Sequence, residues 1–254
     1  MRFLVCVKQV PDSTVKVKVG SDGKSIATEG VTWSISPYDE YAIELALERK
    51  DADPTTIVSV VTVGPARSRD ALRQALAMGC DDATLITGEG AERASAGDIS
   101  AALKGAIDLL KPDLVVCGKQ ASDDDQGLVG PALAALLGWP HVALVTKFAA
   151  AAGGIEIWTE VEGGHEVWKA TGPVVLTVQK SAKEPRYPSL PGIMKAKKKE
   201  IPEHPFVAAD GPRIEILTLE PPPQRGAGKI LKDGDPAALA TQLVTLLRDE
   251  AKVL

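Results

Sequence analysis

Apolar and polar positions along residues 1–150 follow two patterns that take turns. Short apolar runs rich in β-branched residues predict buried strands, whereas segments whose apolar residues recur every three or four positions predict helices. Strands that alternate with helices predict a doubly wound, mostly parallel sheet of the α/β class. The expected strands are 3–7, 56–63, 83–86, 114–117 and 142–148, and the expected helices are 37–50, 67–78, 99–110 and 128–137.

Two of these helices have clear boundary signals. The apolar residues of 99–110 fall on one helical face, and Pro112 prevents the helix from continuing. The sequence Ser36-Pro37-Tyr38-Asp39 is typical of a helix start, with Ser36 as N-cap, Pro37 in the first helical position and an acid completing a capping pattern.

Residues 15–19 alternate strictly between Val and Lys, and a Gly-Ser-Asp-Gly turn sequence follows at 20–23. This pattern predicts a surface hairpin. After Phe148 the alternation of strands and helices stops, and we interpret three runs as the antiparallel strands of a small extension: 155–158, 166–168 and 174–178.

The last part of the chain has a different character. A long Pro- and Lys-rich segment extends to Pro205, and loops of that length are uncommon unless they are functional or act as linkers. An amphipathic helix is expected at 236–247, beyond Pro221-Pro222-Pro223, a stiff spacer that would hold the helix away from the body or direct it to a partner.

Composition and charge exclude some classes of protein. The net charge of −5 argues against a protein that coats nucleic acid or an anionic membrane, and 4% aromatic residues favour helices on a parallel sheet over a β-barrel. A single acid, Glu184, lies among the basic residues of 180–199, so we expect one local basic surface. Its members are Lys180, Lys183, Arg186, Lys195, Lys197, Lys198 and Lys199.

Cysteine and histidine positions bear on compartment and metal chemistry. Cys6, Cys80 and Cys117 are far apart in the sequence, so they do not form the pattern of a disulfide framework. The apolar stretch near the N-terminus is too short for a signal peptide, and no apolar run approaches the length of a membrane span. We therefore expect a cytoplasmic protein with no direct membrane insertion. The three histidines lack the ligand spacing of a zinc site.

The stretch from Leu114 into the helix at Leu128 is the most informative candidate site. A predicted strand ends at Gly118, a polar loop follows, and the N-terminus of a helix then faces the edge of the sheet where open α/β folds bind ligands. Backbone N–H groups and the helix dipole favour an anion such as phosphate there. The stretch matches neither Gly-x-Gly-x-x-Gly nor a P-loop.

Three consecutive acids, Asp123, Asp124 and Asp125, are unexpected in a phosphate loop, because carboxylates repel phosphate. They could cap helix N–H groups or bind a ribose, and a plain solvated acidic turn remains an alternative. A calcium loop fails, because its sixth position would be Leu128 and its twelfth Ala134.

A second candidate site spans 184–199. Prolines at 185, 188 and 191 argue against regular structure, so Leu190, Ile193 and Met194 are expected on a stiffened loop beside the lysines. An apolar anchor with a charged flank suits docking onto an acidic partner. A solvated tail or a nucleic-acid patch is the alternative interpretation of the lysines.

Catalytic groups are not apparent. Ser13, Ser36 and Ser122 have no adjacent His, and no carboxylate pair follows from spacing. Binding and assembly are therefore favoured over bond-breaking chemistry, and we expect no catalytic residue.

Four segments resemble the beta subunit of the electron transfer flavoprotein family, and the resemblance runs along nearly the whole chain. They are 4–10 (LVCVKQV), 75–79 (ALAMG), 118–125 (GKQASDDD) and 184–199 (EPRYPSLPGIMKAKKK). The resemblance implies an electron carrier active in fatty acid β-oxidation, formed with an alpha subunit that holds most of the FAD. It further implies a structural AMP on this chain, flavoprotein dehydrogenases of the acyl-CoA type as electron donors, and a membrane quinone oxidoreductase as acceptor.

The resemblance also assigns residues. The AMP pocket of the family falls on the ends of the predicted strands and on helix starts: Cys6, Ser36, Pro37, Tyr38, Asp39, Val63, Gly118, Lys119, Gln120, Ala121, Ser122, Asp123, Asp124, Asp125, Gln126, Gly127, Leu128 and Val129. Domains are accordingly expected at 1–180, for nucleotide binding, and at 181–254, for partner recognition through a loop and a C-terminal arm.

The dehydrogenase-docking loop of the family falls on Tyr187, Leu190, Pro191, Ile193, Met194, Lys195, Lys197, Lys198 and Lys199, with Leu190 as apolar anchor. Glu160 matches an acid that pairs with an arginine of the alpha subunit and restrains the mobile flavin domain.

The chain departs from the family pattern in three places. Gly127-Leu128-Val129-Gly130 stands where Asn-Gln-Thr-Gly is usual, so backbone N–H groups would have to hold the phosphate. Ser13 stands where some members have a Tyr near the flavin. Asp124 replaces the Gly of electron-bifurcating members, which carry a second FAD in place of AMP. Two alternative functions remain: an electron-bifurcating subunit with a second FAD, and a stand-alone nucleotide-binding module of the stress-protein type.

Overall fold

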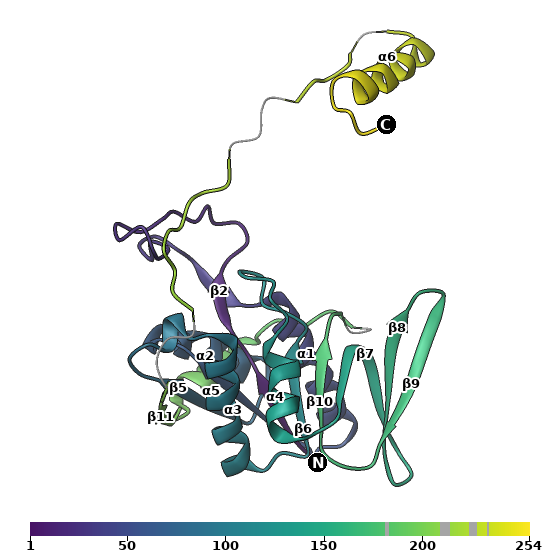
Figure 1. Cartoon of the computed structure of the whole chain (residues 1–254). Coiled ribbons are helices and arrows are strands. Elements are labelled where there is room, and N and C mark those ends of the chain that lie inside the picture. The colour runs from purple at the N-terminus through teal and green to yellow at the C-terminus, as the bar shows by residue number, and fades with distance from the viewer. Residues whose placement is uncertain (181–182, 209–213, 224–227, 233) are drawn as a thin grey trace. The chain divides into compact units, whose positions relative to one another are not determined.

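A sheet of nine strands organises the computed structural model of the chain, which describes all residues except 181–182, 209–213, 224–227 and 233 (Figure 1). Its strand order is β11-β5-β4-β1-β6-β10-β7-β8-β9. The first seven strands in this order run parallel, and β8 and β9 add an antiparallel hairpin at one edge. The expected α/β class with a small antiparallel extension is confirmed.

The strand bounds are β1 Arg2–Cys6, β4 Ile57–Val63, β5 Asp82–Thr87, β6 Leu114–Gly118, β7 His141–Ala151, β8 Gly154–Val161, β9 Gly164–Ala170, β10 Val174–Val178 and β11 Glu203–Pro205. A separate antiparallel pair joins β2 (Gln9–Pro11) to β3 (Trp33–Ile35). The helices are α1 Pro37–Ala52, α2 Arg69–Met78, α3 Ala96–Leu110, α4 Val129–Leu137, α5 Leu190–Lys198 and α6 Pro236–Asp249, with single turns η1 Ala66–Ser68 and η2 Ala91–Arg93.

Helices cover both faces of the sheet because strands of this kind are apolar on both sides. One core cluster packs α1, α2 and Ala196 of α5 against Phe3, Val5 and Val60. The second packs α3 and α4 against the opposite face. In α3, Leu103, Ala106 and Ile107 are buried, as the periodicity predicted.

Three sequence expectations are corrected by the structure. Residues 174–178 form β10, which lies between β6 and β7 and pairs parallel with both, so this strand belongs to the main sheet. The surface hairpin expected at 15–23 is much shorter than the alternation indicates. Val19 forms an antiparallel bridge with Ile26, and the N–H groups of Gly20 and Ala27 donate to the carbonyls of Ser25 and Lys18. The segment expected to be irregular contains α5, with Pro191 in its first turn, where a missing N–H costs nothing.

The structure divides into two compact units, Met1–Leu219 and Glu220–Leu254. The first contains the sheet together with α5 and β11, which follow residue 180 in the sequence. In the second, α6 confirms the predicted amphipathic helix. Asp235 caps it by accepting hydrogen bonds from the N–H groups of Ala237 and Ala238, each at 3.1 Å. No described helix is both long and apolar enough to cross a membrane.

Candidate functional site

The carboxyl ends of β1, β4 and β6 lie side by side at one edge of the sheet. Because these strands are parallel neighbours, their last residues, Cys6, Val63 and Gly118, share the edge where open α/β sheets bind ligands. Cys6 and Cys117 are register partners, and both thiols are free and buried. A hydrogen bond with Cys117, together with burial, raises the pKa of Cys6 well above its usual value, so this thiol is a packing group.

Asp39 of α1 ties two of these strand ends together. Its carboxylate accepts a hydrogen bond from the backbone N–H of Lys8 at 2.8 Å and another from that of Gly118 at 2.9 Å. Burial raises the pKa of Asp39 to about 7, although the two N–H donors oppose that shift. Gly118 leaves no room for a side chain, since a Cβ there would lie 2.8 Å from the Cβ of Tyr38.

The predicted capping pattern at α1 is therefore only partly right. Ser36 does occupy the N-cap position and Pro37 opens the helix, but the Ser36 hydroxyl makes no capping hydrogen bond. Asp39 binds the sheet instead of the helix end. The Ser36 Oγ is buried and has no hydrogen-bond partner among the described residues.

The loop of residues 118–127, called the Gly118 loop below, leads from β6 to α4. The N–H of Lys119 donates to the carbonyl of Val178 at 2.8 Å, and the N–H of Asp125 donates to the carbonyl of Ala121 at 2.9 Å. The Gln120 amide donates to the Asp125 carboxylate at 2.6 Å. Asp125 and Gly127 both take positive φ, 51° and 61°, which Asp and Gly tolerate better than most residues. The loop thereby reverses direction just before the helix.

Lys8, which the sequence patterns did not single out, balances the acidic run of this loop. Its Nζ lies 2.7 Å from an Asp123 oxygen and 2.9 Å from an Asp124 oxygen. Burial acts to lower the pKa of Lys8, but the two carboxylates outweigh burial and the pKa is raised. Two of the three acids are thus paired within the protein, which weakens the repulsion that an anion would otherwise meet.

The first turn of α4 is open to a ligand. Leu128 is the N-cap residue, no described side chain caps the helix, and its first turn contains no acid. The backbone N–H groups of a helix start and its dipole attract an anion. Gly130, in this turn, packs so closely against Thr177 of β10 that a side chain could not be inserted without moving the helix.

The structure brings the other residues expected for the nucleotide to this same sheet edge. Tyr38 is partly buried at the start of α1, and Lys119 Nζ lies 5.2 Å from the centre of its ring. Val63 ends β4, and Val129 opens α4. Pro37, Ser122, Gln126 and Leu128 are exposed.

The residues expected for docking lie on and before α5. Tyr187 is 93% exposed, Leu190 80% and Met194 59%, whereas Ile193 packs partly against the core. Lys195, Lys197 and Lys198 form no ion pair with a described residue, and Lys199 pairs with Asp82 at 3.3 Å. These exposed residues (Tyr187, Leu190, Met194, Lys195, Lys197 and Lys198) are called the α5 surface below.

Much of the expected basic surface is neutralised by α1. Arg186 donates to the buried carboxylate of Glu44 through Nε and a terminal nitrogen, both at 2.8 Å, and to Asp51 at 2.7 Å. Lys183 pairs with Glu48 at 3.2 Å. The positive charge that remains unpaired is therefore concentrated at the end of α5.

Glu160 lies near the end of β8, exposed and opposite His165 of β9. It makes no ion pair within the part of the chain that the structure describes. The acid is accordingly accessible to a cation from outside the chain.

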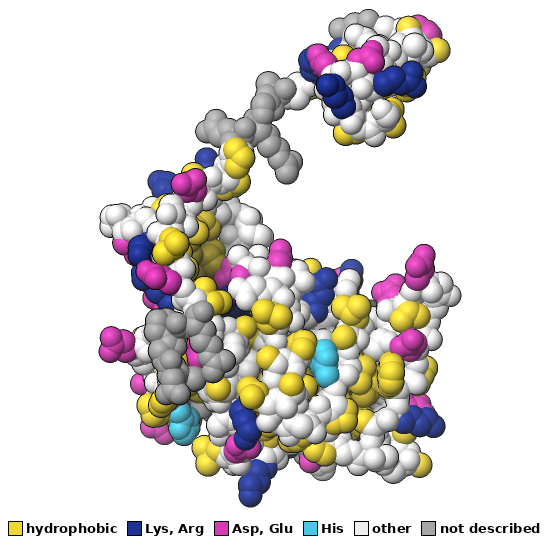
Figure 2. All heavy atoms as spheres, viewed as in Figure 1, with side chains coloured by type: hydrophobic (Ala, Val, Ile, Leu, Met, Phe, Trp, Pro, Cys, Tyr) yellow, Lys and Arg dark blue, Asp and Glu magenta, His cyan; other side chains and the backbone are white. Residues whose placement is uncertain are grey.

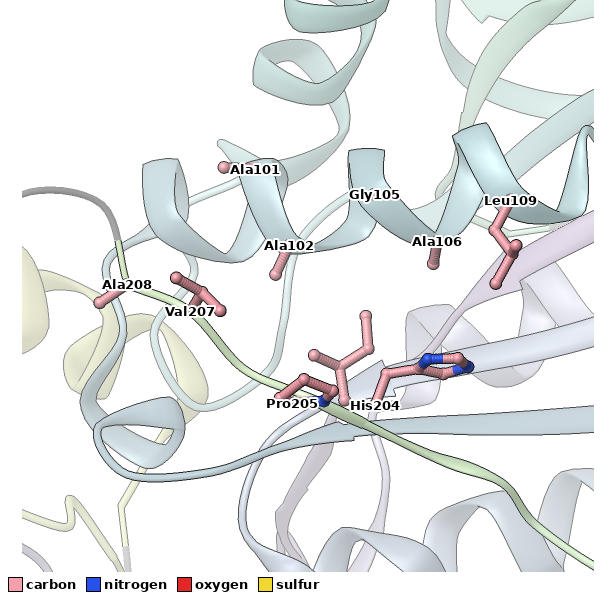
Figure 3. A pocket seen from close by; sticks show the side chains of 10 residues that line it. Ala101, Ala102, Gly105, Ala106, Leu109, His204, Pro205, Val207 and Ala208 are labelled. Carbon is pink, nitrogen blue, oxygen red and sulfur yellow. The ribbon is translucent and has the colours of Figure 1, made fainter.

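An apolar groove of about 420 Å³ lies between α3 and the chain around β11 (Figure 3). Ala102, Gly105 and Leu109 line one side, and Pro205 and Val207 line the other. None of the residues expected for the nucleotide or for docking lines this groove, so it is separate from both sites.

Comparison with known proteins agrees with this arrangement. The model of the electron transfer flavoprotein domain matches residues 24–209. The chain is 41% identical over 261 residues to "Electron transfer flavoprotein subunit beta" of Bacillus subtilis, and 40% identical over 258 residues to the protein of that name from Bradyrhizobium diazoefficiens, with 100% of each chain covered in both cases. It is 37% identical over 255 residues to the Syntrophomonas wolfei protein of the same name, covering 100% of this chain and 98% of that one. Because the family model spans most of the chain and these relatives align from end to end, the chain belongs to the beta subunits of the electron transfer flavoprotein family, which implies a role in electron transfer.

Proposed function

We propose that this chain forms a heterodimer with an electron transfer flavoprotein alpha subunit, binds AMP at the Gly118 loop and helps to enclose an FAD held mainly by the alpha subunit. One observation carries the nucleotide part of the proposal. The uncapped start of α4 follows an acidic run in which Lys8 pairs with two of the three acids. An anion can therefore approach the helix N-terminus.

The residues at this sheet edge fit AMP in charge and in unsatisfied groups. Backbone N–H groups at 128–130 would hold the phosphate, because this chain lacks the polar side chains of the usual Asn-Gln-Thr-Gly sequence. The buried Ser36 hydroxyl, without a partner among the described residues, could donate to and accept from a ribose or base. The Asp124 side chain is bound to Lys8 at the position where bifurcating members have Gly, and this favours AMP over a second FAD.

FAD at the subunit junction would receive electrons from flavoprotein dehydrogenases of the acyl-CoA type and deliver them to a membrane quinone oxidoreductase. The roles that we assign to this chain are binding and positioning: it holds the nucleotide, presents the α5 surface to the dehydrogenase and offers Glu160 to an alpha-subunit arginine. We therefore propose an electron-carrier subunit with no catalytic residue of its own. Three free, buried thiols (Cys6, Cys80 and Cys117) support a reducing, cytoplasmic location.

The surface supports the presence of a partner chain. Figure 2 shows apolar side chains gathered over the region of α4, a helix without any charged residue. Leu128, the N-cap residue of α4, and Leu136, near its end, are 53% and 48% exposed. Apolar patches of this kind on a water-facing surface commonly mark protein interfaces, which argues against the stand-alone alternative.

Native mass spectrometry of the tagged protein, purified from its own cells together with whatever it binds, tests the proposal. A complex of two different chains with one FAD and one AMP is the expected result. Two FAD and no AMP would replace the proposal by the bifurcating alternative. A colourless monomer would overturn the assembly part altogether.

The docking role has its own test, because Leu190 is exposed and lies on α5, outside the Gly118 loop. In the purified complex, Leu190→Ala should raise the KM of an acyl-CoA dehydrogenase for this protein about tenfold, the effect of losing a typical interface anchor. The flavin spectrum should not change. Leu109→Ala, which truncates a leucine 65% exposed on α3, is the matched control and should leave KM unchanged. Equal KM values for Leu190→Ala and the wild type would refute docking through this residue.

A further inference from the structure

The α5 surface stands on a helix that is too short to be stable by itself. α5 has nine residues and contains Pro191 and Gly192, and isolated helices of this length are marginal in water even with good helix formers. Lys195, Lys197 and Lys198 add mutual repulsion in its last turns. Something outside α5 must hold it in a helical conformation.

Contacts along one side of α5 and at its start explain where this helix lies. Gly192 approaches the Ala77 carbonyl of α2 so closely that no side chain fits between them, and Ala196 is buried against the core. At the start of α5, Ser189 Oγ accepts a hydrogen bond from the N–H of Gly192 at 3.1 Å. At the end of α5 the backbone supplies one donor, the N–H of Lys199, which lies 3.2 Å from the carbonyl of Ala196. Other carbonyls at a helix end need donors from outside the helix.

Arg73 of α2 supplies side-chain donors from outside the helix. Its guanidinium donates to the carbonyl of Ala196 in the last turn and to the carbonyl of Lys199, the C-cap residue. A cation at this point also opposes the negative end of the helix dipole. A single partly buried side chain therefore satisfies two carbonyls at the end of α5, and it does so from a helix more than a hundred residues earlier in the sequence.

The neighbouring cations serve other segments. Arg186 binds Glu44 and Asp51 and so fastens the chain before α5. Arg69 donates to the Ile201 carbonyl at 3.2 Å and pairs with Glu203, which fastens the chain after α5. Among these anchors, only Arg73 binds carbonyls of α5 and its cap.

We propose that Arg73 is a positioning residue for partner docking: by binding the carbonyls at the end of α5 it keeps this helix formed, so that Leu190 and Met194 are presented together. This inference rests on the proposed docking function of the α5 surface. Presenting a preformed helix spares the partner the entropy of ordering it, so Arg73 contributes to affinity without touching the partner.

Amide hydrogen exchange on the purified complex tests the effect of Arg73 on α5 without any partner. Arg73→Gln should speed exchange of the α5 amides at least about tenfold, because the helix end loses the donors that α2 supplies. Leu190→Ala should leave that exchange unchanged. Arg93→Gln, which removes a guanidinium paired with Asp22 on an exposed loop, is the control and should behave as the wild type. Unchanged exchange in Arg73→Gln would overturn the inference.

Kinetics with an acyl-CoA dehydrogenase then test the link to docking. Arg73→Gln should raise KM for this protein about tenfold with little change in kcat, and Arg73→Lys, which keeps a donor and a charge, should recover part of the loss. Because Arg73 acts through Leu190 and Met194, the Arg73→Gln and Leu190→Ala effects should be less than additive in the double variant. Full additivity would overturn the positioning role. If Arg73→Gln does not yield the complex, Arg73→Lys carries both tests with a smaller expected effect.

The two proposals fail in different ways. If Leu190→Ala raises KM but the Arg73 variants do not, only the positioning inference is overturned. If Leu190→Ala leaves KM unchanged, the docking function fails, and with it the role of Arg73 in docking.

Discussion

The Gly118 loop and the α5 surface are built in opposite ways. At the carboxyl edge, Asp39 is 6% exposed and its carboxylate holds the ends of β1 and β6 through backbone groups, so the same contacts shape the site and stabilise the sheet. On α5, Leu190 and Tyr187 are 80% and 93% exposed and stabilise little. Changes at the first region should therefore alter stability and nucleotide binding together, whereas changes at the second should alter docking, measured as KM for the dehydrogenase, with little effect on stability.

The largest effect is expected from Gly118→Ala, at the centre of the buried region. The added methyl group would meet the Asp39 carboxylate and the Cβ of Tyr38, so the strand end or α1 must shift. We expect a loss of about 3 kcal/mol in the free energy of unfolding, near the upper end for overpacking, and loss of most of the bound nucleotide. Thermal unfolding and the nucleotide content of acid extracts measure both.

Gly105→Ala in α3 is the matched control. No atom lies within 4 Å of the added methyl group, and alanine is favoured over glycine inside a helix by about 1 kcal/mol. This variant should be as stable as the wild type or more so, with full nucleotide content. Similar behaviour of the two variants would mean that the carboxyl edge is not close-packed.

A smaller effect, dependent on pH, is expected from Asp39→Asn. The pKa of Asp39 is about 7 in the folded protein and 3.8 ordinarily, so the folded state holds this proton more tightly than the unfolded chain does. The stability that the neutral carboxyl group contributes is therefore present below about pH 4 and is lost as pH rises toward about 7. Asparagine cannot titrate, so the variant should not lose this part of its free energy of unfolding as pH rises.

The measurement is thermal unfolding of the wild type and Asp39→Asn with AMP in excess, at pH values from about 5 to about 8. The wild type should lose about 2 kcal/mol relative to the variant over the acid half of this range, and the difference should level off above about pH 7. If the free energies of unfolding of the two proteins changed with pH in parallel, Asp39 would be ionised over the whole range. Its two N–H donors favour that ionised form.

The smallest effect on stability is expected from Glu160→Ala, in the exposed hairpin. An exposed ion pair contributes between about 0 and 1 kcal/mol, so the melting temperature of the complex should hardly move. Electron-transfer rates should change if the acid restrains the flavin domain, and stopped-flow reduction by the dehydrogenase measures them. Glu162→Ala, in the adjoining turn of the hairpin, is the control and should leave the rates unchanged. A large fall in melting temperature with unaltered rates would contradict this role, because it would show that Glu160 contributes to stability and not to electron transfer.

Local patterns were sufficient to place the Gly118 loop at the carboxyl edge of the sheet. A strand that ends in glycine, a polar loop and a helix start occur in direct succession at 114–128, and the order of these elements alone puts the loop at the carboxyl edge. Local patterns were insufficient to predict the role of Asp39. Its two hydrogen-bond donors are the backbone N–H groups of residues 8 and 118, and nothing in the sequence near Asp39 indicates them. Lys8 was missed for the same reason, since its carboxylates lie 115 and 116 residues away.

The α5 segment shows a different failure. Its prolines argued against regular structure, yet Pro191 lies in the first turn of a helix, and Ser189 before it is a good N-cap residue that could have revealed the helix start. For β10, an apolar run of five residues indicates a strand but says nothing of its neighbours or direction. The parallel pairing of β10 with β6 and β7 was therefore not predictable from the run.

The sequence by itself determined the α/β class, the alternation of the main strands and helices up to residue 148, the position of the Gly118 loop and, through its motifs, the family. These depend on spacing and succession within short windows, where backbone geometry leaves few options. Only the tertiary structure decided that Asp39 binds strand ends, that Lys8 pairs with the acidic loop and that Arg73 binds the end of α5. Each of these depends on side chains that meet across long separations in sequence, because burial and hydrogen bonding in the folded core select partners that no local pattern specifies.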